Sequence, residues 1–217
     1  RGVSKINSLS VAPVNQFNAD AKSQKDFETF WNGEKEIPVI EALDGQLITN
    51  KIMMAPKVAD GKIVSDVEKD VLKIVVVNRY NNAPVAIAFI KNFGFKEGAI
   101  ASSVAHDSHN IVAVGVDDES LCRAVNLVIA QKGGVSCVSK NEEAVLALPV
   151  AGLMSSDDGY KVAAAYSEID AQAKALGSPL SAPFMTLSFM ALLVIPHLKM
   201  SDKGLFNGDT FSFITNV

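Results

Sequence analysis

The sequence predicts an α+β fold in which a largely antiparallel sheet packs against helices. Short runs rich in β-branched residues come mostly in adjacent pairs, joined by short turn-forming connections. Segments with apolar residues three and four positions apart follow these pairs instead of alternating with single strands. Because a doubly wound parallel sheet needs a helix between successive strands, this order favours the α+β arrangement.

The first 62 residues are predicted to form an irregular, β-rich segment. Residues 1–36 show no sustained helix or strand period. In residues 37–62, short apolar runs are broken by Asp-Gly pairs at 44–45 and 60–61, which are strong turn signals. We therefore place a boundary near residue 62 and expect the main domain over residues 63–217.

Four strands are predicted in the first half of the main domain. The apolar runs of strand length cover residues 71–77, 85–90, 99–104 and 111–116. A linker of Asn, Asn, Ala and Pro at 81–84 separates the first two runs and favours a turn. The last two runs flank a polar segment, and side chains can converge on such a connection without disturbing the sheet.

Helical periodicity begins after the fourth strand. Apolar residues at 121, 124, 125, 128 and 129 predict a helix, which Asp117 or Asp118 can cap and the Gly-Gly pair at 133–134 can end. The remaining elements that the sequence predicts are strands at 135–138 and 144–148 and helices at 157–176 and 184–193.

Composition narrows the classes of partner. The 217 residues are 48% hydrophobic, enough for one substantial core, and a net charge of −4 gives no basic surface for nucleic acid. The most apolar run, 184–195, is shorter than the roughly 20 residues that span a bilayer. No secretory leader opens the chain, so we expect a cytoplasmic protein with no membrane partner. Cys122 and Cys137 form no metal-binding or disulfide pattern and are expected to be reduced core residues.

Residues 98–110 form the most informative segment for function. They read Gly-Ala-Ile-Ala-Ser-Ser-Val-Ala-His-Asp-Ser-His-Asn and hold two of the three histidines of the chain. Imidazole and amide N–H groups can donate hydrogen bonds to ring nitrogens, and a carboxylate can accept them. Arg79 could meet a carboxylate or a neighbouring subunit, although an ordinary salt-bridged arginine fits the sequence as well. The candidate ligand-contacting residues are Ser102, Ser103, His106, Asp107, Ser108, His109, Asn110 and Arg79.

Other interpretations of this segment fit the sequence less well or need no ligand. A triad of Ser108, His109 and Asp107 is disfavoured because adjacent side chains project in different directions. A metal site is disfavoured because His106 and His109 share a face only in a helix, and no thiolate lies near them in sequence. A purely structural interpretation pairs His106 with Asp107 and uses Asn110 to cap a turn.

The segment resembles the signature of the C-terminal domain of bacterial and archaeal adenine deaminases, which are metal-dependent members of the amidohydrolase superfamily. Two positions depart from the family pattern, because Tyr80 stands where histidine is common and Asn92 where glycine is frequent. Residues 1–62 resemble the end of the subdomain beside the catalytic barrel. Further blocks of likeness follow in family order over 37–49, 89–94, 148–155 and 183–192, so that the resemblance covers residues 37–217.

The resemblance implies a parent enzyme that hydrolyses adenine to hypoxanthine and ammonia at a binuclear centre of manganese, iron or zinc. Such a centre needs a His-x-His pair and two further histidines, but this chain has three histidines and no such pair. We therefore expect the metals on a catalytic barrel outside this chain, and expect the chain alone to be inactive.

The partners implied by the resemblance are the barrel domain, adenine as substrate of the parent, and further copies in a homo-oligomer. Segment 102–110 is then expected to cover or shape the purine site. Two alternatives remain open: a structural or oligomerisation domain without ligand contact, and a stand-alone purine-binding module.

Overall fold

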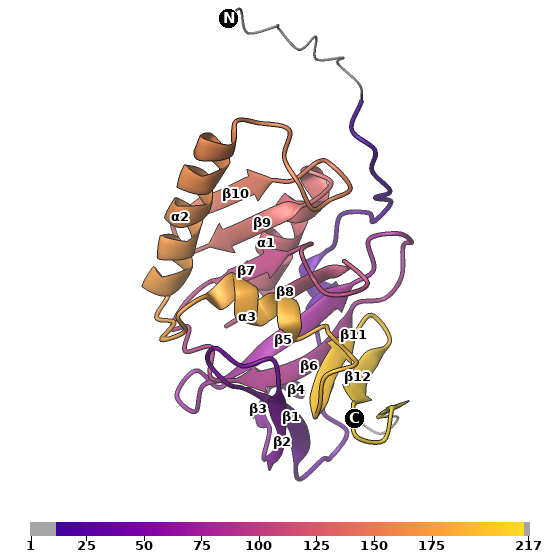
Figure 1. The fold of residues 1–217 in the computed structure, drawn as a ribbon. Helices are drawn as coiled ribbons and strands as arrows, with labels where there is room; N and C mark the ends of the chain where they lie inside the picture. Colours follow the sequence, from indigo (N-terminus) through magenta and orange to yellow (C-terminus); the bar gives the residue numbers. More distant parts are fainter. Residues whose placement is uncertain (1–11, 215–217) are drawn as a thin grey trace, which may run out of the picture.

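The computed structural model describes residues 12–214 and is built around one eight-stranded sheet (Figure 1). The strand order is β10-β9-β7-β8-β5-β6-β1-β2. Only β1 and β6 pair in parallel, and the other neighbours are antiparallel, so the predicted α+β class is confirmed. The strands of this sheet are β1 (Ile37–Ala42), β2 (Thr49–Met54), β5 (Val71–Val77), β6 (Ala86–Lys91), β7 (Ala99–Ser102), β8 (Ile111–Gly115), β9 (Gly134–Val138) and β10 (Glu143–Ala147).

Both faces of the sheet are covered, as its long apolar runs require. On β5, Ile74 and Val76 point to one face, and Val75 and Val77 point to the other. Helix α1 (Asp118–Ala130) covers the face of Val75, and Figure 1 shows it behind the sheet. The elements on the opposite face are α2 (Gly159–Ala175), α3 (Pro183–Phe189) and a small sheet of β11 (Leu198–Ser201), β12 (Gly204–Asn207) and β13 (Ser212–Phe213).

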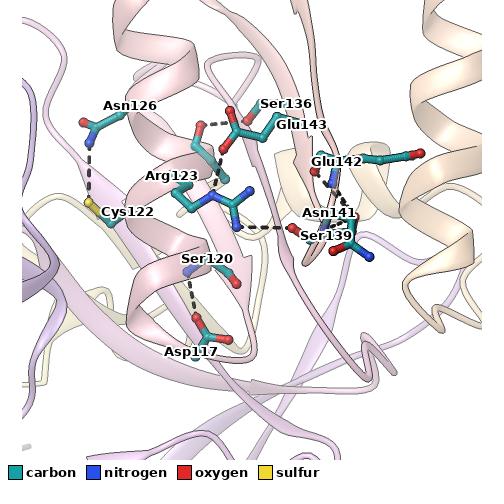
Figure 2. A network of polar contacts seen from close by, with 11 residues as sticks. Asp117, Ser120, Cys122, Arg123, Asn126, Ser136, Ser139, Asn141, Glu142 and Glu143 are labelled. Atoms are coloured by element: carbon teal, nitrogen blue, oxygen red, sulfur yellow. Dashed lines mark hydrogen bonds and ion pairs between the residues drawn. The ribbon is translucent and has the colours of Figure 1, made fainter.

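Helix α1 begins where the sequence predicts. The Asp117 carboxylate accepts a hydrogen bond from the Ser120 N–H at 2.7 Å, so Asp117 is the N-cap. Asp118, the other candidate, instead pairs with the ammonium group of the buried Lys73. Figure 2 shows how polar contacts tie the helix to the β9–β10 hairpin, where the Arg123 Nε donates to the Glu143 carboxylate at 2.7 Å.

Helix α2 is attached more loosely than α1. Of its 17 residues, only Ile169 and Ala173 are buried, and both lie in its second half. The Asp158 carboxylate caps its N-terminus by accepting from the N–H groups of Tyr160 and Lys161. Figure 1 shows the helix at the outer end of the sheet, beside β10.

Several predicted elements end earlier than the sequence suggests. The strand expected over 99–104 stops at Ser102, whose hydroxyl accepts from the Val104 N–H at 3.0 Å and turns the chain. The helix expected over 184–193 stops at Phe189, because the Met190 carbonyl accepts from the Met200 N–H and starts the pairing toward the small sheet. That small sheet was not predicted.

The amino-terminal part contains a short 3₁₀ helix, η1 (Gln24–Phe27), and a hairpin of β3 (Lys57–Ala59) and β4 (Lys62–Val64). Residues 12–36 are otherwise mostly irregular, as expected, and residues 1–11 lie outside the described part. Strands β1 and β2 extend the main sheet, so the sheet crosses residue 62, and the domain boundary expected there stays a prediction. Among the described residues, no helix has the length and apolarity to cross a membrane.

Candidate functional site

The polar segment lies on the connection between β7 and β8, which pair in the main sheet as predicted. Its residues separate into two groups by burial. The tip, defined as His106, Asp107, Ser108 and His109, is exposed or half-buried. The base, defined as Ser102, Ser103, Asn110 and the neighbouring Arg79, is buried. The eight candidate residues therefore lie together, but only the tip faces outward.

Ser103 anchors the base to the start of β9 at Gly134 and to the turn at Gly152. Its hydroxyl donates to the Gly152 carbonyl at 2.6 Å and accepts from the Gly134 N–H at 2.8 Å. The Ser103 N–H also donates to the Gly134 carbonyl at 3.0 Å. The hydroxyl and the N–H of this buried residue are therefore bonded within the fold, which gives Ser103 a structural role.

Arg79 supports the segment from below and is only 5% exposed. Its Nη1 donates to the Ala151 carbonyl at 2.7 Å, and its backbone N–H donates to the Asn110 side-chain oxygen at 3.2 Å. Its Nη2 donates to the Tyr80 hydroxyl at 2.9 Å, which in turn donates to the Ser108 carbonyl at 2.8 Å. Arg79 thus acts on the tip through Tyr80, the position at which the sequence departs from the family pattern.

The rings of the two histidines of the tip lie edge-on to each other, with centroids 6.1 Å apart. The His106 ring stacks on Phe189 of α3 with centroids 5.3 Å apart, and the His106 backbone N–H donates to the Ser188 carbonyl. Burial, followed by the positive charge of Arg79, lowers the pKa of His109 below its usual value of 6.5. The His109 ring is therefore neutral at pH 7, and its buried Nδ1 has no hydrogen-bond partner among the described residues.

Two cavities adjoin the segment. An apolar cleft of 440 Å³ is lined by residues of α2 and α3 and reaches the segment at Ser102, in the base, and at Val104. A second cavity of 450 Å³ lies between the tip and the small C-terminal sheet, and Asp107 and Ser108 form one of its walls. Only the second cavity offers an exposed carboxylate beside aromatic rings, a combination suited to hold a planar ligand or a partner surface.

The described residues hold no group of three or more histidine, cysteine, aspartate or glutamate side chains that could bind a metal ion. Their donors therefore do not fit the binuclear centre that the resemblance implies, and no chemical step through a metal is assigned to them. Among the residues that sequence reasoning missed are Gly152 and Phe189, which contact the candidate site. Both lie in sequence blocks that resemble the family, so their place in those blocks was the available signal.

Comparison with known proteins identifies the family. The family model described as the adenine deaminase C-terminal domain matches residues 46–212. An adenine deaminase of Borreliella burgdorferi is 45% identical over 98% of this chain, and those of Methanosarcina acetivorans and Sulfurovum sp. are 53% and 51% identical over 84% and 96%. The chain spans 39%, 33% and 38% of the length of these three relatives. This chain therefore belongs to the adenine deaminase C-terminal domain family.

Proposed function

We propose that this chain is the C-terminal portion of an adenine deaminase, and that segment 102–110 covers or shapes the purine site of the parent enzyme. The observation that carries the proposal is the match of nearly the whole chain to proteins named adenine deaminase. The parent would hydrolyse adenine to hypoxanthine and ammonia. Its metals, manganese, iron or zinc, would lie in the remaining length of the parent.

The exposure of the tip supports this role for the segment. An exposed Asp107 can accept hydrogen bonds from the exocyclic amine of adenine. A neutral His109 can donate or accept one hydrogen bond at Nε2, because its Nδ1 is buried, and a purine offers both kinds of partner. The base supports these side chains, because Ser103, Asn110 and Arg79 each make hydrogen bonds within the fold.

The test is the kinetics of adenine deamination by the full-length parent carrying His106→Ala. We expect kcat/KM to fall about tenfold or more, the effect of losing one substrate contact or its support, while metal content and folding are retained. The control is His197→Ala, because His197 is an exposed histidine that pairs with Asp209 outside the segment. Its kinetics should stay close to those of the unchanged parent.

Near-native kinetics for His106→Ala would contradict the active-site role and leave a structural or oligomerisation domain. In that case, substitutions that change assembly would alter the kinetics of the parent more than substitutions in the tip. A stand-alone purine-binding module would instead release or absorb heat when adenine or hypoxanthine is titrated into this chain. Titration without a heat change excludes that alternative.

A further inference from the structure

Three phenylalanines of the small C-terminal sheet form a cluster next to the tip. The Phe206 ring lies edge-on to the rings of Phe211 and Phe213, with centroids 5.2 Å apart in both pairs. Phe206 is buried, but Phe211 is 67% exposed and Phe213 is 41% exposed. The two outer rings therefore present apolar area that residues 12–214 leave exposed.

This aromatic cluster lines the cavity that also contains Asp107 and Ser108. Val194, 61% exposed, adds apolar area from the segment after α3. Asp202 and Lys203 lie at the same cavity and give it a polar edge. An apolar centre with aromatic rings and a charged rim is the usual composition of a protein interface. We define the aromatic surface as Val194, Phe206, Phe211 and Phe213.

The relatives indicate what covers the aromatic surface. More than half of each relative lies outside the matched region, and the family is described as a C-terminal domain, so most of the parent precedes this chain. Residues 14–18, near the start of the described chain, bond to the domain at Arg79, which supports the tip, and at Ala151. The Asn18 N–H donates to the Arg79 carbonyl at 2.7 Å, and the Val14 carbonyl accepts from the Ala151 N–H at 2.6 Å.

We infer that the aromatic surface docks the preceding, catalytic part of the parent chain and thereby holds the tip of segment 102–110 against it. The matching surface would be apolar at its centre, with polar or charged groups facing Asp202 and Lys203, because these charges would otherwise lose water without a partner. This inference rests on the proposed function, since it takes the preceding part to be the catalytic one.

The test uses the full-length parent carrying Phe211→Asn. Phe211 has a φ of +53°, a left-handed conformation that asparagine adopts readily, so the substitution removes the ring without straining the backbone. The matched control is Tyr160→Asn, which removes an 89% exposed aromatic ring from the first turn of α2, a position that does not line the cavity. Circular dichroism establishes that both variants remain folded.

The readout is hydrogen exchange of the backbone amides in residues 104–109 and 204–213, with limited proteolysis between the two parts of the parent. We expect Phe211→Asn to speed exchange and cleavage about tenfold, the effect of losing one central interface side chain, and Tyr160→Asn to change neither. These readouts need no substrate, so they test docking even if the parent does not act on adenine.

Unchanged exchange and cleavage in Phe211→Asn would overturn the inference. It would also be overturned if the variant lost oligomer mass in light scattering while the protection between the two parts stayed intact, because a second copy of the chain would then be the occupant. A fall in kcat/KM for adenine together with faster exchange would support both docking and the proposed function.

Discussion

Replacing Ser103 by alanine separates anchoring from ligand contact within the segment. The hydroxyl of this fully buried side chain satisfies the Gly152 carbonyl at 2.6 Å and the Gly134 N–H at 2.8 Å. Its removal leaves two buried backbone groups with one partner fewer, and each such loss costs about 1–2 kcal/mol. We therefore expect Ser103→Ala to lower the free energy of unfolding by about 2–4 kcal/mol.

The assay is equilibrium unfolding in urea, followed by circular dichroism. With a urea dependence of about 2 kcal/mol per molar, typical of a small domain, the midpoint should fall by about 1–2 M. Ser108→Ala is the control, because Ser108 is exposed and only its carbonyl is bonded to Tyr80. That variant should stay within about 0.5 kcal/mol of the unchanged chain. A Ser103→Ala midpoint equal to that of Ser108→Ala would refute the assignment of Ser103 as an anchor.

Three further predictions concern buried groups. In Gly152→Ala, the new Cβ would collide with the Arg79 guanidinium, and the φ of +71° at this position disfavours alanine. We expect the free energy of unfolding to fall by at least about 2 kcal/mol, and an unchanged urea midpoint would contradict this. Burial lowers the pKa of Lys199 from 10.5 to about 8, so between pH 8 and 10.5 the unfolded chain binds more protons than the folded chain. Stability should therefore rise with pH over this interval, and the rise should be absent in Lys199→Met. The lowered pKa of His109 likewise makes the unfolded chain bind more protons just below pH 6.5, so this group should reduce stability as pH falls through that value; an NMR titration midpoint at or above 6.5 would exclude the shift.

The central strands and the first helix could be predicted because their signals are local. Every residue of β5 is buried, and an apolar run rich in β-branched residues, interrupted only by Lys73, marks this strand by itself. Helix α1 carries a clear apolar period and a capping aspartate, and Asp117 fills that role. The strands of the small C-terminal sheet have four residues or fewer, too few to show a period, so they are specified by pairing that only the folded chain provides.

The location of the candidate site was predictable, but the division of its residues into a buried base and an exposed tip was not. The cluster at 102–110 stands out in the sequence, and its place between two paired strands follows from the flanking apolar runs. The contact from Arg79 to Ala151 joins positions 72 residues apart, and no local pattern signals it. The sequence therefore indicated which residues gather at the site, whereas burial decides which of them can meet a ligand.

The separation of a buried base from an exposed tip has a consequence for how this domain can change over generations. Side chains of the tip are exposed or half-buried, so new residues can be tried there with little loss of stability. Substitutions in the base, such as at Ser103, face the opposite constraint, because they remove hydrogen bonds that hold three loops together. Laboratory evolution toward a different purine should therefore accumulate changes at 106–109 and leave 79, 102, 103 and 110 as they are.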